Sequence, residues 1–235
     1  MATKYGMVVR KMIIAIDGPA ASGKSTAAKQ IAQHLNMLYI DTGAMYRGVA
    51  LNAFEQNVAF DNLLAMGILL ENIKLDFKTA DGVEQIYLNG KNVTTKIRSQ
   101  EITKLSSEIA TIKIVRAKMV ELQRTLSKNH HDVILEGRDI GTVVFPNADV
   151  KFFLVASIEE RAKRRLVELV KKGVTTDFEQ VKSDLLWRDK NDSMRVESPL
   201  LKAEDAVEID TTHLTLDAQV KKMMKIIQKK TFSSR

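Results

Sequence analysis

The chain has 235 residues, of which 45% are hydrophobic and 28% charged, a composition typical of a globular protein with one sizeable core. It contains no cysteine, which excludes disulfides and thiolate metal sites, and its four histidines lack the spacing of a zinc site. The apolar runs are too short to span a membrane and the basic N-terminal residues lead to no signal peptide, so we expect a cytoplasmic protein with no membrane partner.

Five short apolar runs are separated mostly by helical patterns. They lie at residues 12–16, 38–40, 133–135, 150–155 and 206–209. Strands that alternate with helices predict an α/β fold, with a five-stranded parallel sheet and helices on both faces. Such sheets bind ligands at the carboxyl ends of their strands, so we expect the chemistry directly after each run.

Two segments depart from this rhythm. Between residues 63 and 107, alternating apolar residues, an Asp81-Gly82 turn and a strand with a tight turn at 86–90 predict a small antiparallel insert. After residue 157, two capping-box patterns begin, one at Ser157 and one at Thr176, and they predict two helices joined by a short loop. We therefore predict a core (10–62, 108–156 and 197–230), an insert (63–107) and a two-helix lid region (157–196).

The C-terminal segment carries most of the excess in the net charge of +7, because residues 221–235 hold six basic and no acidic side chains. Apolar residues recur there at helical spacing, at Leu216, Val220, Met223 and Ile227. This pattern predicts an amphipathic helix with its lysines in solvent. A nucleic-acid or membrane-surface role for the lysines is the less favoured alternative.

The first strand is followed by the pattern G-x-x-x-x-G-K-[ST] and then by a helical run, the context that a phosphate-binding P-loop requires. Its backbone N–H groups would hold phosphate, Lys24 would add positive charge, and the Ser25 hydroxyl would be a ligand of Mg²⁺. We therefore expect a P-loop NTPase fold that binds ATP. The predicted ATP-binding residues are Gly18, Pro19, Ala20, Ala21, Ser22, Gly23, Lys24, Ser25 and Thr26.

A P-loop occurs in several classes of enzyme, so other motifs must distinguish a kinase from a GTPase or another ATPase. The N-K-x-D and D-x-x-G motifs of GTPases are missing. Instead, the second strand is followed by D-T-G-A-M-Y-R (41–47), the third by E-G-R-D-I-G (136–141), and a late helix carries R-D-x-x-D-x-x-R (188–195). Three arginines, Arg47, Arg138 and Arg195, should therefore converge on one crevice, as a dianionic acceptor beside an anionic ATP would demand.

With these four motifs in this order, the chain resembles the bacterial cytidylate kinase family from about Ile13 to Thr212, including the insert of its bacterial members. The resemblance implies transfer of the γ-phosphoryl group of ATP to CMP or dCMP by a monomer, with the insert and the lid closing over the nucleotides. It also implies that the three arginines hold the acceptor phosphate and that Arg188 and Asp192 hold the sugar. Outside the R-D-x-x-D-x-x-R motif, Arg188 and Asp192 would be interpreted as an ordinary surface salt bridge.

The resemblance assigns the base to Ser107, Arg116 and Asp139. A carboxylate can accept from the amine of cytosine but repels the O4 of uracil, so we expect CMP to be preferred over UMP. Ser107 and Arg116 lie in the least distinctive stretch, and a solvated helix surface is the alternative for both. The predicted substrate-binding residues are Thr42, Tyr46, Arg47, Ser107, Arg116, Arg138, Asp139, Arg188, Asp192 and Arg195.

Arg161, Arg164 and Arg165 share one side of the first lid helix. They could reach the transferred phosphoryl group or form a salt-bridged surface with neighbouring glutamates, and the resemblance favours the first role. The acceptor phosphate is already ionised at neutral pH, so no general base is needed. The predicted catalytic residues are Lys24, Arg138, Arg195, Arg161 and Arg165.

Three carboxylates at strand ends, Asp17, Asp41 and Glu136, are candidates to support Mg²⁺ through water, and the sequence does not choose among them. Two alternatives to the proposed activity stay open. A P-loop kinase for another acceptor, such as UMP or AMP, would carry a similar core. A basic RNA-binding ATPase would agree with the pI of about 9.4, but the chain lacks interleaved aromatic residues for base stacking, so we expect no nucleic-acid partner.

Overall fold

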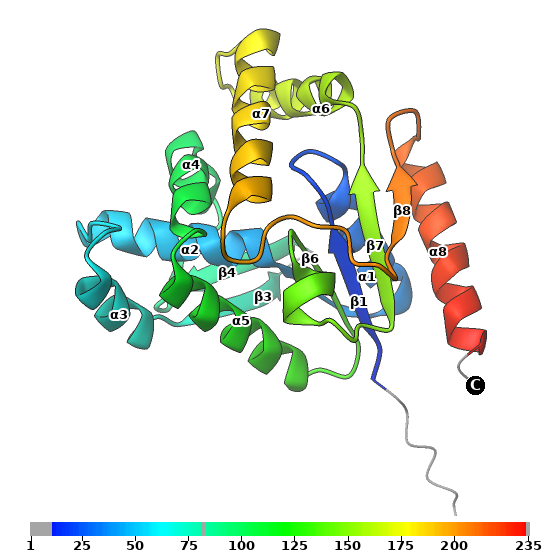
Figure 1. The fold of residues 1–235 in the computed structure, drawn as a ribbon, viewed down its shortest axis with the longest axis horizontal. Helices are drawn as coiled ribbons and strands as arrows, with labels where there is room; N and C mark the ends of the chain where they lie inside the picture. The colour runs from blue at the N-terminus through cyan, green and yellow to red at the C-terminus, as the bar shows by residue number, and fades with distance from the viewer. Residues whose placement is uncertain (1–10, 81–82, 234–235) are drawn as a thin grey trace, which may run out of the picture.

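The computed structural model describes residues 11–80 and 83–233, so the predicted turn at 81–82 lies outside the described residues. A five-stranded parallel sheet in the order β2-β6-β1-β7-β8 forms the centre of the molecule (Figure 1). This confirms the predicted sheet, with strand ends shifted by one or two residues. The strands are β1 (Ile13–Asp17), β2 (Leu38–Asp41), β6 (Val133–Gly137), β7 (Val150–Val155) and β8 (Val207–Asp210).

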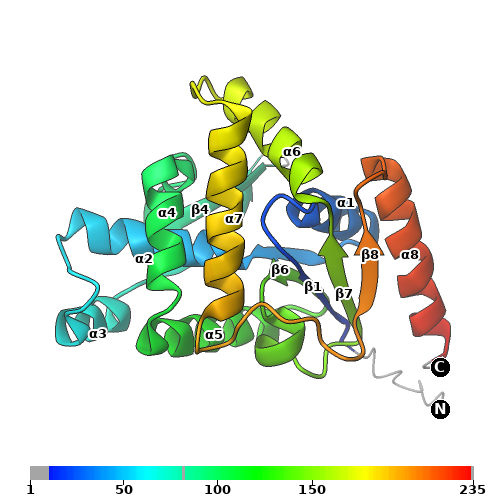
Figure 2. The ribbon, with the colours of Figure 1, turned by 45° about the horizontal axis from the view of Figure 1, so that its top comes forward.

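Helices cover both faces of this sheet, as predicted (Figures 1 and 2). Side chains of β1 alternate between two apolar cores, because successive residues of a strand point to opposite faces. Ile14 and Ile16 pack with α1 and α8, whereas Ala15 packs with α2 and α5. The helices are α1 (Lys24–Leu35), α2 (Thr42–Glu55), α3 (Leu63–Glu71), α4 (Gln100–Ile109), α5 (Lys113–Lys128), α6 (Ile158–Lys171), α7 (Phe178–Met194) and α8 (Leu216–Ser233).

The register between β1 and its neighbours aligns the carboxyl ends of β1 and β6, while β7 extends two residues further. Asp17, the last residue of β1, lies opposite Gly137 of β6 and Phe153 of β7. The P-loop after β1 and the Arg138-Asp139 pair after β6 therefore leave the sheet at the same level. This alignment places two of the predicted motifs side by side at the carboxyl edge of the sheet.

The C-terminal helix α8 is amphipathic, as predicted. Val220, Met223 and Ile227 are buried against α1 and the sheet, and Leu216 is partly buried there. No helix within the described ranges is long and apolar enough to cross a bilayer. The apolar face of α8 is thus used by the core of the domain.

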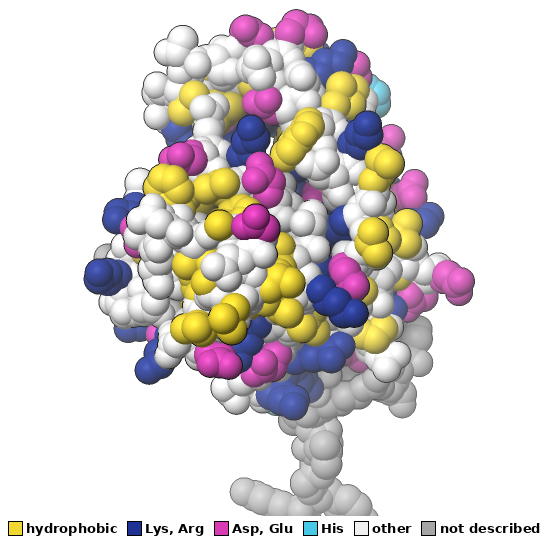
Figure 3. Space-filling view, turned by 60° about the vertical axis from the view of Figure 1, so that its left-hand side comes forward, with side chains coloured by type: hydrophobic (Ala, Val, Ile, Leu, Met, Phe, Trp, Pro, Cys, Tyr) yellow, Lys and Arg dark blue, Asp and Glu magenta, His cyan; other side chains and the backbone are white. Residues whose placement is uncertain are grey.

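The predicted antiparallel insert contains a three-stranded sheet in the order β3-β4-β5, followed by a 3₁₀ turn, η1 (Lys96–Arg98). Helix α4 packs against α2 and runs two residues past the predicted end of the insert at residue 107. Hydrophobic side chains lie among charged ones on the face that carries α3 and α4 (Figure 3). The strands are β3 (Leu75–Ala80), β4 (Val83–Leu88) and β5 (Lys91–Asn92).

The two lid helices, α6 and α7, project beyond the carboxyl ends of the strands (Figures 1 and 2). Ser157 caps α6 as predicted, because its side chain accepts a hydrogen bond from Glu160 N at 3.2 Å. The second capping prediction is wrong by one residue: Asp177, not Thr176, caps α7 by accepting from Gln180 N at 2.9 Å. Aspartate is at least as good an N-cap residue as threonine, so the helix begins one residue later than predicted.

Burial predicts how leucines contribute to stability. Leu135, on β6, is fully buried, whereas Leu64, on α3, is 79% exposed. We expect Leu135→Ala to lower the free energy of unfolding by about 2–5 kcal/mol, because it removes packed methyl groups and leaves a cavity. The matched control Leu64→Ala should change it by less than about 0.5 kcal/mol. Denaturant titration of both variants measures the difference, and equal losses would contradict the assignment of β6 to the core.

Candidate active site

The P-loop joins β1 to α1, and its backbone geometry requires glycine. Gly18 has a φ of +146°, and a Cβ at this position would lie 2.1 Å from the carbonyl oxygen of Leu154. Gly23 has a φ of +88°, which also favours glycine. The loop can therefore curl closely over β7, and its successive amides precede the N-terminus of α1, as a phosphate site requires.

Lys24 is buried beneath this loop. Its ammonium group donates to Pro19 O at 2.6 Å and lies 3.4 Å from Ser22 Oγ. Burial, together with the nearby cation of Arg138, lowers the pKa of Lys24 to about 7. An anion beside this lysine would stabilise its charged form, so the site favours a phosphate group as its ligand.

Ser25 and Glu136 form a pair of oxygen ligands beside the P-loop. The Ser25 hydroxyl donates to Glu136 Oε1, and Tyr39 OH donates to the same oxygen at 3.0 Å. Hydroxyl and carboxylate oxygens are the ligand types that Mg²⁺ prefers. Within the described part of the chain, no group of three or more histidines and carboxylates could hold a metal by itself, so a metal here would also need water or phosphate ligands.

The two other candidate carboxylates are engaged elsewhere. Asp17 is buried and accepts from Ile140 N at 2.8 Å and Gly141 N at 2.7 Å. Burial raises its pKa to about 6 even though both amides donate to it. Asp41 caps α2 and pairs with Arg47 at 2.9 Å. Of the three candidates, Glu136 is therefore the one in contact with Ser25.

A narrow pocket lies next to Lys24, between the start of α2, the end of β6, α4, α5 and α7. Nine of the ten predicted substrate-binding residues line it; Arg47 is the exception and pairs with Asp41 nearby. Its volume is about 50 Å³, well below the roughly 300–1,000 Å³ of typical ligand sites. The narrow pocket as it stands is therefore smaller than a typical nucleotide site. Gly43, Ser106 and Ala110 also line it and were not predicted.

Carboxylates hold the arginines of this pocket in place. Arg116 pairs with Asp139, and Arg138 donates to Asp192 at 2.6 Å. Arg195 lies 4.0 Å from Asp139 and 3.9 Å from Asp192. Burial would raise the pKa of Asp192, but the cations around it outweigh this effect and keep the pKa below its ordinary value. The pocket thus combines several buried charges of both signs in a small volume.

Several guanidinium donors at this pocket have no partner. Buried N–H groups without hydrogen bonds occur in four arginines around it: Arg47, Arg116, Arg188 and Arg195. Arg188 also has no ion pair within 4 Å among the described residues, and burial beside Arg138 lowers its pKa to about 10. Because buried donors without acceptors are costly, this cluster favours a ligand rich in acceptor oxygens.

Two smaller residues complete the pocket wall. The Thr42 hydroxyl donates to Glu136 O at 2.7 Å, which joins the start of α2 to the end of β6. The Tyr46 ring lies 5.6 Å from the guanidinium of Arg116, and burial raises the pKa of Tyr46 to about 12. Its phenol is therefore a neutral hydrogen-bonding group at physiological pH.

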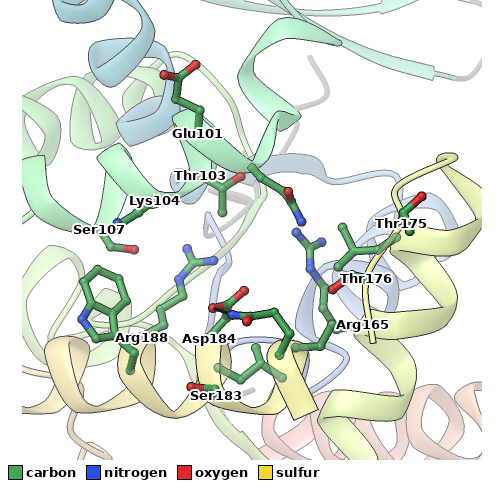
Figure 4. Close-up of a pocket in the computed structure, with 16 residues that line it drawn as sticks. Glu101, Thr103, Lys104, Ser107, Arg165, Thr175, Thr176, Ser183, Asp184 and Arg188 are labelled. Carbon is green, nitrogen blue, oxygen red and sulfur yellow. Dashed lines mark hydrogen bonds between the residues drawn. The ribbon is translucent and has the colours of Figure 1, made fainter. Parts of the chain in front are cut away.

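A larger cavity of about 630 Å³ lies between α4 and the lid helices (Figure 4). Ser107 and Arg188 line both this cavity and the narrow pocket, so the two spaces adjoin. Arg165 and Trp187, the single tryptophan of the chain, also line it. The cavity lies between α4 and the lid helices, next to the narrow pocket.

The lid arginines have different partners. Arg161 is buried and donates to Ala20 O of the P-loop at 3.3 Å and to Asp189 of α7 at 2.5 Å. Arg165 forms an ion pair with Glu168, so the salt-bridged surface that the sequence analysis gave as an alternative is present at this residue. Arg161 therefore joins the lid to the P-loop, whereas only Arg165 faces the larger cavity.

Arg164 connects the lid to β8 through a residue that sequence reasoning missed. It pairs with Glu160 and donates to Thr211 O at 2.6 Å. The buried Thr211 hydroxyl lies 3.1 Å from Ser22 O of the P-loop. The position of Thr211 directly after a strand was a usable signal.

A second missed residue is Gln219 of α8, which is 3% exposed and donates to Gly23 O at 3.5 Å. A polar side chain within the apolar stripe of a helix was the available signal. Thr211 and Gln219 together brace the P-loop from outside its motif.

Fold and site together define the class: a P-loop kinase with a cationic acceptor pocket. The cytidylate kinase family model matches residues 14–229, and the chain therefore belongs to the cytidylate kinase family. The chain is 50% identical over 219 residues to a cytidylate kinase of Lactobacillus johnsonii, and the alignment covers 93% of this chain and 95% of the relative. It is 51% identical over 218 residues to a cytidylate kinase of Fusobacterium nucleatum, with 93% and 98% covered.

A solved structure supports the fold at greater distance. An uncharacterized protein from Eubacterium ventriosum aligns with a TM-score of 0.50 at 14% identity, covering 93% of this chain and 99% of that chain.

The lowered pKa of Lys24 predicts proton uptake when ATP binds. At pH 8 the free lysine is mostly neutral, because its pKa is about 7, and polyphosphate stabilises the charged form. ATP binding should therefore take up as much as about one proton at pH 8 and much less at pH 6. Calorimetry in buffers of different ionisation enthalpy measures this number. Lys24→Met should abolish the uptake; an unchanged uptake would assign it to another group.

Proposed function

We propose that this enzyme transfers the γ-phosphoryl group of ATP to CMP or dCMP, giving ADP and CDP or dCDP. The observation that carries the proposal is the cluster of four arginines, in and beside the narrow pocket, whose buried N–H groups lack partners; one of them, Arg188, also acts electrostatically on the P-loop lysine. A phosphate dianion offers the acceptor oxygens that these donors lack. The motifs at these positions and the names of the relatives support cytidine monophosphate as the molecule that bears this phosphate.

The donor site is built from the P-loop. Its amides and Lys24 would hold the β- and γ-phosphates of ATP, and Ser25 with Glu136 would hold Mg²⁺. When bound, the metal neutralises phosphate charge. Lys24 and Arg138 lie close enough to influence each other's charge, so they can stabilise the oxygens of the group in transfer from two sides.

The acceptor site needs positioning more than proton transfer. A phosphate oxygen is already ionised near neutral pH, so the arginines only have to hold it in line with the donor. Arg47, Arg138 and Arg195 would bind the phosphate, and Arg188 with Asp192 the sugar. The ion pair between Arg138 and Asp192 supports this division, because it places a phosphate ligand and a sugar ligand in contact.

Base identity would depend on Asp139. Its carboxylate lines the pocket and pairs with Arg116, while Ser107 lies on the opposite wall, on α4. This arrangement offers a charged acceptor for the amine of cytosine and donors for its ring acceptors. Preference for CMP over UMP follows, since uracil would present an acceptor to Asp139.

Closure of the site would come from the insert and the lid. The narrow pocket has walls from α4, in the insert, and from α7, in the lid, and both must move for a nucleotide to enter. Arg161 and Arg165 would follow the lid toward the phosphates, which would exclude water from the transfer. That the enzyme acts as a cytoplasmic monomer in pyrimidine metabolism, without a nucleic-acid partner, remains a prediction from the sequence.

Measurement of ADP release with ATP and Mg²⁺ tests the proposed activity. The acceptors CMP, dCMP, UMP, AMP and GMP are compared with a reaction that lacks acceptor. We expect high rates with CMP and dCMP only, because Asp139 selects the cytosine amine. Preferred use of UMP or AMP would retain kinase activity but reject this base assignment, and fast turnover without acceptor would reject the kinase.

The contact between Ser25 and Glu136 predicts a change in metal dependence. Glu136→Gln should raise the Mg²⁺ concentration for half-maximal rate by about tenfold or more, the usual effect of losing a carboxylate that orients metal ligands. The control is Glu121→Gln on α5, which is exposed and pairs only with Lys118 among the contacts described. Titration of the rate with Mg²⁺ at fixed ATP measures both. Equal Mg²⁺ dependence of the two variants would remove Glu136 from the metal site.

A further inference from the structure

Asp139 stands at the N-cap of a short turn, η2 (Ile140–Val144), but does not cap it. Its backbone has φ −144° and ψ 25°, and its side chain accepts no hydrogen bond from the turn. Aspartate is among the preferred N-cap residues because its carboxylate usually folds back onto the first free amides. Here the carboxylate instead faces the pocket and pairs with Arg116. Some other group must therefore satisfy the amides.

That group is Asp17, from the end of β1. Its Oδ1 accepts from Ile140 N at 2.8 Å and its Oδ2 from Gly141 N at 2.7 Å. Asp17 is 4% exposed, and β1 and β6 are in register at this residue, so both carboxylate oxygens are held in place. The turn is capped by a side chain more than 120 residues away in the sequence.

Gly141 lies close to both Asp17 and Lys151. A Cβ at residue 141 would be in van der Waals contact with Asp17 Oδ2 at 3.4 Å and would come within 3.1 Å of the Lys151 side chain. The rest of the turn closes on its own backbone, since Val143 N donates to Asp139 O at 2.9 Å. One of the two amides bound by Asp17, that of Gly141, is the second of the turn, a position that an N-cap side chain such as that of Asp139 commonly satisfies.

We propose that Asp17 is a positioning residue for base selection: it caps the turn in place of Asp139 and so leaves the Asp139 carboxylate free to face the acceptor base. This inference rests on the proposed function, in which Asp139 accepts from the cytosine amine. Without Asp17, the amides of Ile140 and Gly141 lose their acceptor, and Asp139, at the N-cap position, can fold its carboxylate back onto the freed amide of Gly141. Asp139 then turns away from Arg116 and from the base.

A double-mutant cycle tests this role. The ratio of kcat/KM for CMP to that for UMP is measured in the wild type, Asp17→Asn, Asp139→Asn and the double variant. Asparagine can accept from only one of the two amides. We expect each single variant to lower the ratio by about tenfold, the scale of one hydrogen bond, and the double variant to lower it no further.

The outcomes separate the inference from the proposed function. A wild-type enzyme without preference for CMP, or an Asp139→Asn variant that keeps the preference, would reject the base assignment itself. If Asp139→Asn loses the preference but Asp17→Asn retains it, the positioning role is overturned. Additive effects, or an equal loss of CMP and UMP turnover in Asp17→Asn, would also overturn it, because Asp17 would then act on the fold and not through Asp139.

Asp149→Asn is the matched control. Asp149 accepts from Ile13 N at 2.8 Å, so it makes the same kind of bond at the opposite end of β1. This variant should lose stability without a change in the CMP to UMP ratio. If Asp17→Asn fails to fold in a thermal unfolding measurement, Asp17→Ser provides one uncharged acceptor for the same cycle, and the same outcomes decide.

Discussion

The parallel register between β1 and β6 determines the geometry of the whole site. Because Asp17 lies opposite Gly137, the P-loop and the Arg138-Asp139 pair begin at the same level of the sheet. The donor lysine and an acceptor arginine therefore become neighbours without any contact between their own motifs. The same alignment lets Asp17 reach the amides of the turn after β6. A shift of one residue would separate all of these groups.

Electrostatics gives the pocket its character. Arginines crowd around a small space, and their mutual repulsion is opposed by two carboxylates, Asp139 and Asp192. Buried cations with unused donors are unfavourable in the free enzyme, and a phosphate dianion relieves this cost. In the proposed function, binding energy is therefore stored where the charge of the reaction develops. The carboxylates would then have a second task, since each would also present an acceptor to the nucleoside.

The sequence predicts the strands and helices, and which residues line the site, better than it predicts the contacts between those residues. Strand positions follow from short apolar runs and the P-loop from its spacing, because both depend on local patterns. That Glu136, and not Asp17 or Asp41, contacts Ser25 could not be predicted, since this contact depends on which strand ends face each other. The cap of α7 was missed because Thr176 and Asp177 offer competing registers. Local patterns mark Thr211 and Gln219 as unusual positions, but their contacts with the P-loop, 189 and 196 residues earlier in the chain, could not be predicted from those patterns.

This bracing has a consequence for how the protein is made. The P-loop is encoded within the first 26 residues, yet its carbonyl groups at Ser22 and Gly23 are held by Thr211 and Gln219. During synthesis, β1 and α1 leave the ribosome before β8 and α8 do. The P-loop is therefore made well before Thr211 and Gln219, so the contacts that hold its carbonyl groups can form only after residue 219 has been added.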